Sequence, residues 1–311
     1  MTAAGFDALT LDQVRLFVCV AREGSFSAAA RRLHRAQSAV SYGVANLEKL
    51  LGVQLFDRSG HRPTLTETGR GLLSEARQIL DDVGRLRARA SSVADGLELV
   101  VHLAVDAICP AELLIELCKA FQEQFPTVSL HIHTEVLSAV AALVLEGTCH
   151  VGISGPIGVD AEELERHFIT HIPMVPVAAA SLPLSELPSP ISRAHVRGQV
   201  QIVISQRVSS PSSMDHGVLS DTTWRVADAA TKLSLIRAGL GWGNLPLDLV
   251  REDLERGSLV QLVLDEWAPS PLMVPLSAIA RTDSPPGPAG QWLLRMLETL
   301  CLRCGTPAAT D

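Results

Sequence analysis

The chain has 311 residues, 47% of them apolar, and a formal net charge of −8 at pH 7. This length exceeds that of one ordinary domain, so we expect two or three compact units with sizeable cores. Its apolar runs are too short to cross a membrane, and residues 1–10 lack the charged start and apolar stretch of a signal peptide. These features argue against an integral membrane protein or an exported one and predict a cytoplasmic protein.

The charge is distributed unevenly along the chain. Residues 1–95 hold 13 Lys and Arg against 10 Asp and Glu, whereas the remaining residues hold 13 against 24. A mildly basic head on an acidic body suggests that only the head meets a polyanion such as DNA. The six cysteines follow no regular spacing, which suits reduced thiols: Cys19, Cys109, Cys118, Cys149, Cys301 and Cys304.

Three helical patterns with short connections fill residues 11–52. The first, Leu11–Arg22, stops at Gly24, and Ser25 is the predicted N-cap of a short second helix. The turn of residues 34–36 then leads to a third helix, an order that predicts a helix-turn-helix. Helical spacing predicts a shared core from the apolar positions Val14, Phe17, Val18, Ala21, Phe26, Ala29, Ala30, Leu33, Val40, Val44, Leu47 and Leu51.

The third helix is predicted to expose a short, polar and uncharged surface. Amide and hydroxyl groups on such a surface can contact base edges in the major groove of DNA. The residues on this surface are Gln37, Ser38, Ser41, Tyr42, Ala45 and Asn46. Arg31, Arg32 and Arg35 precede the helix, where they can hold phosphates. Periodicity alone leaves open a small helical bundle with a solvated arginine face.

Residues 53–69, "VQLFDRSGHRPTLTETG", combine two short apolar pieces with a basic turn. This pattern predicts a two-stranded wing beside the helix-turn-helix. Arg58 and Arg62 would lie over the DNA backbone or minor groove, where phosphate contacts supply affinity and register.

A single helical pattern then runs from Thr66 to about Val93. Its apolar residues repeat at heptad spacing, which is typical of a coiled-coil seam. They are Leu72, Ala76, Ile79, Val83, Leu86, Ala90 and Val93. Because one helix cannot bury such a stripe alone, the pattern predicts a dimer. Burial against the chain's own C-terminal body is the alternative.

Residues 9–70 resemble the N-terminal domain of LysR-type transcriptional regulators. The matching pieces are "FVCVAREGSFSAAARRL", "AQSAVS", "NLEKLLGVQLFDRSG" and "LTETGR". The sequence departs from the family pattern at Tyr42-Gly43, where polar or basic residues are usual. Gly43 costs helix stability, about 1 kcal/mol relative to Ala, and we expect base readout there to differ from the common pattern.

From residue 97 onward, apolar strand patterns alternate with helical ones. This alternation predicts βαβ units around a mostly parallel sheet. A Pro-rich passage (Pro173, Pro176, Pro183, Pro188, Pro190) is predicted to interrupt it. The expected strands are 97–106, 128–136, 149–154, 200–205, 222–228, 240–246 and 271–280, and the expected helices include 111–125, 138–147, 229–238 and 290–303.

The body resembles the effector-binding domain of the same regulators, which is like a periplasmic binding protein. The resemblance rests on "FPTVSLHIHTEV", "LVLEGTCHVGIS" and "LSLIRAGLGWGNLP". It implies a homodimer or homotetramer with paired heads. We expect a winged helix-turn-helix at 1–65, a linker helix at 66–94, an effector-binding domain at 95–304 and a flexible tail at 305–311. Lobe one would hold 97–171 and 272–304, and lobe two 172–271.

Ligands of open α/β sheets bind beyond the carboxyl ends of the strands. This rule predicts an effector cleft at Asp106, Cys109, Ser138, Ser205, Arg207, Asp228 and Asn244. For each residue the alternative is a helix cap or turn without a ligand. The expected effector is a small organic molecule with a carboxylate or a substituted ring. It should be neutral or singly charged, because Asp106 and Asp228 would repel a highly charged anion.

Other chemistries have weaker support. His131, His133 and the Cys149-His150 pair lack an evident metal-site spacing, as does the Cys301-x-x-Cys304 pair, so we expect no metal and no cofactor. No cysteine lies between Cys149 and Cys301, which argues against a paired-thiol peroxide switch, and Cys109 as a single-thiol sensor stays open. The predicted function is a ligand-responsive transcriptional regulator. A solute-binding transport protein and an enzyme are the alternatives, and no catalytic constellation supports the enzyme.

Overall fold

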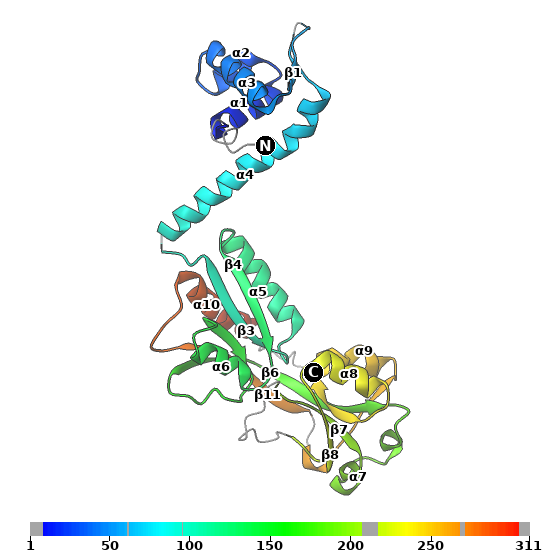
Figure 1. The fold of residues 1–311 in the computed structure, drawn as a ribbon. Helices are drawn as coiled ribbons and strands as arrows, with labels where there is room; N and C mark the ends of the chain where they lie inside the picture. The colour runs from blue at the N-terminus through cyan, green and yellow to red at the C-terminus, as the bar shows by residue number, and fades with distance from the viewer. Residues whose placement is uncertain (1–8, 61, 95, 207–216, 268–270, 305–311) are drawn as a thin grey trace, which may run out of the picture. The chain divides into compact units, whose positions relative to one another are not determined.

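The computed structural model describes residues 9–60, 62–94, 96–206, 217–267 and 271–304 (Figure 1). The chain divides into two compact units, residues 1–91 and residues 92–311. No helix in the described ranges is both long and apolar enough to cross a membrane. The first unit is helical with a small two-stranded sheet, and the second is built on one large sheet.

Three helices open the first unit: α1 (Leu11–Glu23), α2 (Phe26–Arg32) and α3 (Gln37–Leu51). Local caps fix their starts. The Thr10 hydroxyl accepts a hydrogen bond from the Gln13 amide at 3.3 Å, and the Ser25 hydroxyl accepts one from the Ala28 amide at 3.1 Å. The Ser25 cap and the three-helix order are therefore confirmed.

The predicted core of these helices is confirmed except at Leu51. Val18, Ala21 and Leu33 are partly buried and pack against this core, and the inward stripe of α1 also includes Leu16, Cys19 and Val20. Leu51 was expected to face inward, but it is 41% exposed in the last turn of α3, directly before the chain leaves at Gly52.

Gly43 lies where α3 approaches α1. A Cβ atom at this position would come within 2.3 Å of Leu16 Cδ1, so a larger residue would displace that side chain. The glycine therefore permits close helix packing. Its departure from the family pattern concerns the core of the head, whereas neighbouring Tyr42 is 75% exposed.

The predicted wing is confirmed. Strands β1 (Phe56–Asp57) and β2 (Thr64–Leu65) pair antiparallel, with Phe56 opposite Leu65. The Phe56 ring packs edge-on against Phe17 at 5.7 Å and against Phe26 at 5.6 Å between ring centroids. These aromatic contacts fix the wing to α1 and α2.

Helix α4 (Glu67–Ala94) has the predicted length, but its apolar stripe has two roles. Leu72 and Ala76 pack into the core of the head, so the seam prediction is wrong for these two positions. Farther along, Ile79, Leu86 and Val93 are exposed within one chain. The exposed part keeps the heptad spacing of a seam that a second chain can cover.

The second unit contains a nine-stranded sheet, with strand order β4-β3-β5-β11-β6-β9-β7-β8 and β10 paired to β6. The expectation of a mostly parallel sheet is wrong, because β6 and β11 pair antiparallel with each other and with their other neighbours. The parallel pairs are β3–β4, β3–β5, β7–β8 and β7–β9. The strands are β3 (Val100–Asp106), β4 (Ser129–Glu135), β5 (Val151–Ser154), β6 (Leu164–Ala179), β7 (Val200–Ile204), β8 (Thr222–Val226), β9 (Trp242–Pro246), β10 (Leu259–Gln261) and β11 (Leu272–Arg281).

Strand β6 joins the two lobes of this unit. It pairs with β11 as far as Met174 and then with β9 from Met174 to Ala178. The prediction that the Pro-rich passage interrupts the fold is wrong for Pro173 and Pro176, which both lie inside β6. They fall where the strand changes partners, a place that tolerates residues without an amide donor.

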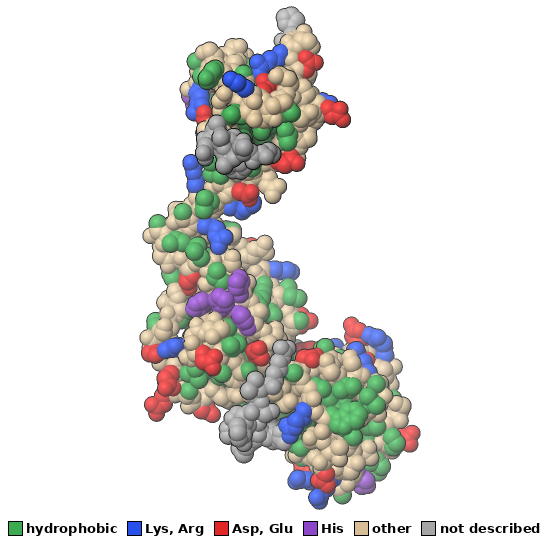
Figure 2. Space-filling model, in the orientation of Figure 1, with side chains coloured by type: hydrophobic (Ala, Val, Ile, Leu, Met, Phe, Trp, Pro, Cys, Tyr) green, Lys and Arg blue, Asp and Glu red, His purple; other side chains and the backbone are tan. Residues whose placement is uncertain are grey.

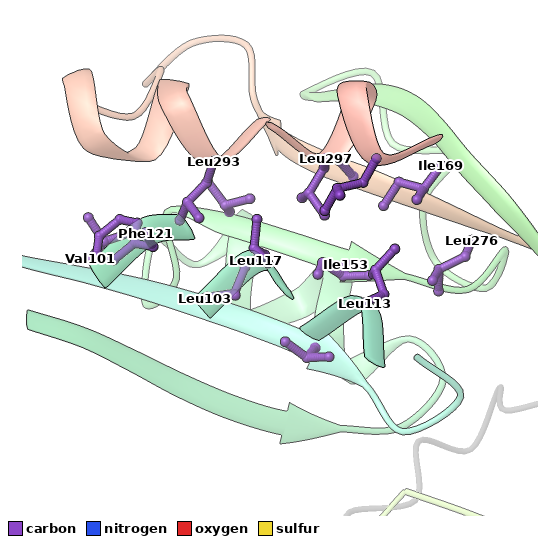
Figure 3. Packing of buried hydrophobic residues seen from close by; sticks show 14 of the residues in the cluster. Val101, Leu103, Leu113, Leu117, Phe121, Ile153, Ile169, Leu276, Leu293 and Leu297 are labelled. Atoms are coloured by element: carbon purple, nitrogen blue, oxygen red, sulfur yellow. The ribbon is translucent and has the colours of Figure 1, made fainter. Parts of the chain in front are cut away.

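Helices cover both faces of each lobe. In lobe one, α5 (Ala111–Gln124) and α10 (Pro288–Cys304) enclose the largest core, in which Leu293 and Leu297 point toward the sheet (Figure 3). Helix α6 (Ala139–Leu145) covers the opposite face. In lobe two, α8 (Ala229–Arg237) and α9 (Leu247–Glu255) cover one core, and the short helix α7 (Arg193–Arg197) covers another.

Candidate functional site

The first half of α3 presents the polar surface expected of a DNA-reading helix. Gln37, Ser38 and Tyr42 are exposed, as is Ala45, whereas Ser41 and Asn46 are partly exposed. Short side chains leave the backbone close to whatever this surface contacts, which suits insertion into the major groove.

Some of the arginines around α3 form ion pairs with acidic residues of the protein, and others do not. Arg35 pairs with Asp12 at 2.6 Å, Arg32 with Glu23 at 3.2 Å and Arg58 with Glu48 at 2.9 Å. Arg31 and Arg62 are exposed, and neither forms an ion pair with a residue that the structure describes. These two side chains have the most charge to offer a phosphate.

Glu48 organises the wing and was missed by the sequence analysis. Its carboxylate is almost fully buried and accepts hydrogen bonds from the amides of Leu55 at 2.8 Å and Phe56 at 3.1 Å. The Arg58 guanidinium completes the site and lies 5.0 Å from the Phe26 ring centroid. An acid four residues after the buried Val44 was the available signal, because it falls on the inward face of α3.

In the second unit, a cavity of about 410 Å³ lies between the two lobes. The predicted residues Asp106 and Asn244 line it. Asp106 ends β3, in agreement with the strand-end rule, whereas Asn244 lies at the middle of β9. Most of the remaining lining is apolar and comes from both lobes, including Ile108, Val136, Ile157, Met174, Val203 and Met273. Such a surface favours a small organic ligand with few polar groups.

Asp106 supplies an acidic group at the end of β3. It is 5% exposed; its Oδ1 accepts a hydrogen bond from the Ile108 amide at 3.1 Å, and its Oδ2 accepts one from the Gly155 amide at 3.4 Å. Burial raises the pKa of Asp106 to about 6, although both hydrogen bonds oppose this shift. The carboxyl group therefore titrates close to neutral pH.

Lys232 supplies a basic group from α8 and was also missed. It is 5% exposed, and burial lowers its pKa to about 8. Among the residues that the structure describes, none forms a hydrogen bond or ion pair with its ammonium. A Cβ on Gly243 would lie 2.8 Å from Lys232 Cε, so this glycine leaves room for the lysine stem. Lysine four residues before the buried Ile236, on the same helix face, was the available signal.

Two further features mark the cavity. The Asn244 Oδ1 atom is buried and has no hydrogen-bond partner within the described part of the chain. Leu137 lines the cavity in a left-handed backbone conformation, with φ at 57°. An unpaired acceptor and a strained leucine are both costly, and such features gather at ligand sites.

Four of the predicted cleft residues do not line this cavity: Asp228, Ser205, Ser138 and Cys109. Asp228 caps α8, with its carboxylate accepting the Thr231 amide at 2.7 Å, as the cap alternative proposed. Ser205 is partly buried directly after β7. Ser138 joins the lobes, because the side-chain carbonyl of Gln206, once its amide is oriented toward donors, accepts from the Ser138 hydroxyl and amide. Arg207 lies outside the described residues.

Cys109 is the fourth residue, and its environment opposes the thiol-sensor hypothesis. Its Sγ donates a hydrogen bond to the Pro110 carbonyl at 3.7 Å. Burial raises the pKa of the thiol to about 12, and the nearby Asp106 adds to the shift. Burial therefore disfavours the thiolate that a single-thiol sensor requires, although Cys109 lies close to the start of α5.

Histidine side chains gather on one face of lobe one (Figure 2). His102 Nδ1 lies 3.1 Å from His133 Nε2, and the rings of His131 and His150 lie 4.9 and 5.7 Å from the His102 ring. Burial, followed by repulsion from these neighbours, lowers the pKa of His102. Within the described residues, no group of three metal-ligating side chains is arranged to hold an ion. The absence of a metal stays a prediction.

Comparison with known proteins assigns both units. The family described as "LysR substrate binding domain" matches residues 94–301, and "Bacterial regulatory helix-turn-helix protein, lysR family" matches residues 11–70. The probable HTH-type transcriptional regulator YhaJ of Escherichia coli K12 is 30% identical over 94% of this chain and 97% of its own length. The uncharacterized HTH-type transcriptional regulator YeeY of the same strain is 31% identical over 81% of this chain and 82% of its own.

One solved structure supports the fold. A full-length OxyR variant from Pseudomonas aeruginosa covers 94% of this chain and 99% of its own, with a TM-score of 0.50 and 19% identity. Family membership also decides against the enzyme and transport alternatives. The chain belongs to the LysR family of bacterial regulators and is a ligand-responsive, DNA-binding transcriptional regulator.

Proposed function

We propose that this regulator controls promoter binding through a small, mainly apolar effector held in the cavity between the lobes of its body. The observation that carries the proposal is the cavity itself, which combines an apolar lining with buried ionisable groups from both lobes. The proposed effector contacts are Asp106, Lys232 and Asn244. A bacterial regulator of this kind acts on DNA in the cytoplasm, so we retain that localisation.

We assign base recognition to Gln37, Ser38, Ser41 and Tyr42 on the exposed face of α3. Their amide and hydroxyl groups match the donors and acceptors that base edges present in the major groove. Phosphate contacts are assigned first to Arg31 and Arg62, whose charge no described carboxylate neutralises. Arg35 and Arg58 keep a secondary role, because each already pairs with an acid.

Control of DNA binding requires that the effector prefer one conformation of the body. A ligand in this cavity contacts both lobes, so its binding energy depends on how the lobes are arranged. The Gln206–Ser138 contact also spans the lobes and contributes to the same equilibrium. Couplings of about 1–3 kcal/mol are common between two such sites.

We propose that α4 pairs two chains through Ile79, Val83, Leu86, Ala90 and Val93. Four of these apolar side chains are exposed and Val83 is partly exposed, and a second copy of the same helix would bury them. Paired heads then contact two half-sites on one DNA duplex, and a homotetramer adds a second pair.

Fluorescence anisotropy with a labelled duplex from the regulated promoter tests the DNA-reading assignment. Gln37→Ala and Ser41→Ala should change the ratio of affinities for specific and unrelated duplexes, because they alter base contacts. Lys49→Ala, in the last turn of the same helix, is the control and should leave this ratio unchanged. If all three variants keep the wild-type ratio, α3 does not read bases through these residues.

A further inference from the structure

We propose that the effector is a zwitterion: an ammonium group and a carboxylate on a small apolar body. The structure assigns its ammonium to Asp106 and its carboxylate to Lys232. This inference rests on the proposed role of the cavity as the effector site. The sequence predicts a neutral or singly charged effector. A zwitterion is one class of neutral molecule, because its two opposite charges sum to zero.

Asp106 and Lys232 are buried ionisable groups without a partner of opposite charge among the described residues. Asp106 accepts two backbone hydrogen bonds but faces no cation among the described residues, and Lys232 faces no described anion. An unpaired charge is costly to bury, so side chains of this kind are usually paired or functional. A ligand that carries both opposite charges would satisfy the two groups at once.

The two groups come from different lobes. Asp106 ends β3 in lobe one, whereas Lys232 lies on α8 in lobe two, and both line the same cavity. Neither side chain contributes to the pKa of the other, so they do not neutralise each other in this conformation. A zwitterion between them would bond to both lobes, and this gives it a differential affinity for one lobe arrangement.

The charges of Asp106 and Lys232 also determine which ligands the cavity rejects. A dicarboxylate would place a negative group beside Asp106, and a diamine would place a positive group beside Lys232; both arrangements are repulsive. The apolar lining from Ile108, Met174 and Val203 suits a hydrocarbon side chain. Asn244 Oδ1, an unpaired acceptor, can take a further ammonium hydrogen.

Proton linkage gives this class of ligand a distinctive signature. At pH 6 the incoming ammonium lowers the pKa of Asp106, so binding releases protons. At pH 8 the incoming carboxylate raises the pKa of Lys232, so binding takes up protons. A carboxylic acid without the amine gives no release at pH 6, and an amine without the carboxylate gives no uptake at pH 8.

The test is calorimetric titration of the full chain with matched triads of probes. Leucine is compared with 4-methylpentanoate and isopentylamine, and phenylalanine with 3-phenylpropanoate and 2-phenylethylamine. A longer zwitterion, 5-aminopentanoate, is compared with pentanoate and pentylamine, because the spacing of the two charges is part of the question. Each titration is run at pH 6 and pH 8 in two buffers of different ionisation enthalpy, which yields the number of protons exchanged.

We expect at least one zwitterion to bind about tenfold or more tightly than both of its analogues, because each analogue leaves one buried charge unpaired. It should release protons at pH 6 and take them up at pH 8. Asp106→Asn should remove the preference over the amine-free analogue, and Lys232→Met the preference over the carboxylate-free analogue. The controls Asp160→Asn and Lys119→Met, at exposed positions, should retain both preferences.

The inference is wrong if no zwitterion binds more tightly than both of its analogues, or if Asp106→Asn and Lys232→Met leave its affinity unchanged. Failure of the proposed function gives a different result. If a singly charged or uncharged molecule binds the cavity and changes DNA affinity, the cavity remains the effector site and the zwitterion assignment alone fails. If cavity ligands bind without changing DNA affinity, the proposed function fails.

Discussion

Asp106 and Lys232 each place an ionisable group where water is largely excluded, and each lowers the stability of the effector-free protein at neutral pH. The strand-end rule predicted Asp106 from sequence, because this residue ends β3. Asn244 was predicted with it and also lines the cavity, but it lies at the middle of β9. The rule missed Lys232, which projects from the inward face of a helix. It also selected Asp228, whose sequence position suits a ligand contact and a helix cap equally well.

Lys232→Met should stabilise the effector-free protein at pH 7. Lowering the lysine pKa from 10.5 to about 8 means that the folded state binds protons less strongly than the unfolded state. Stability is therefore lost as the pH falls from 10.5 to about 8, by about 3 kcal/mol in total. In urea unfolding, the variant should have a higher free energy of unfolding than the wild type at pH 7. This difference should become smaller above pH 8. A lower unfolding midpoint for the variant at pH 7 would contradict this account.

Asp106→Asn should show the opposite pH dependence. Raising the carboxyl pKa from 3.8 to about 6 means that stability is present below pH 3.8 and is lost as the pH rises through 6. The total is again about 3 kcal/mol. In the same assay, the free energy of unfolding of the variant should equal that of the wild type near pH 4 and exceed it at pH 7.5. A constant difference across this range would show that burial does not perturb Asp106.

At the scale of elements, the head follows from local signals, whereas the body sheet does not. Interactions between residues close in sequence form the helix caps at Thr10 and Ser25 and the basic turn of the wing. Their positions could therefore be predicted from the sequence. The antiparallel pairing of β6 with β11 joins segments far apart in the sequence, and no local pattern encodes its direction. The wing also depends on Glu48, whose burial appears only once α3 is packed.

Arg62→Ala and Arg58→Ala should separate DNA contact from wing structure. Arg62→Ala should weaken binding to all duplexes and lower the salt slope by about 1, with no change in unfolding. Arg58→Ala should also destabilise the head, because the buried Glu48 carboxylate loses its cation. Anisotropy across salt concentrations and thermal unfolding measure the two effects. A wild-type slope in Arg62→Ala would remove this residue from the DNA surface.

At the scale of the whole molecule, α4 contributes to the core of the head and also carries an exposed apolar stripe. The heptad pattern of α4 indicated a seam, but sequence spacing could not reveal that Leu72 and Ala76 serve the head's own core. One heptad pattern therefore supplies apolar residues both for packing within the chain and for the proposed contact with a second chain. The exposed residues Ile79, Leu86 and Val93 are the part that a partner must cover.

Ile79→Asp should dissociate the assembly, because it places an unpaired charge in the seam. Sedimentation should show a smaller particle than wild type, and DNA affinity should fall as the paired heads separate. Gln78→Asp introduces the same charge one residue away, outside the heptad stripe, and should leave the mass unchanged. An intact assembly in Ile79→Asp would contradict the proposed seam.

The central claim is that ligand binding between the lobes controls DNA binding by the head. Its most direct test is a linkage measurement with the tightest ligand of the cavity, in which DNA affinity is measured at increasing ligand concentration and ligand affinity with and without DNA. The account predicts that ligand and DNA change each other's affinity by the same factor. It also predicts that Lys232→Met abolishes the coupling and leaves ligand-free DNA affinity near wild type. DNA affinity that is unchanged at saturating ligand would contradict it.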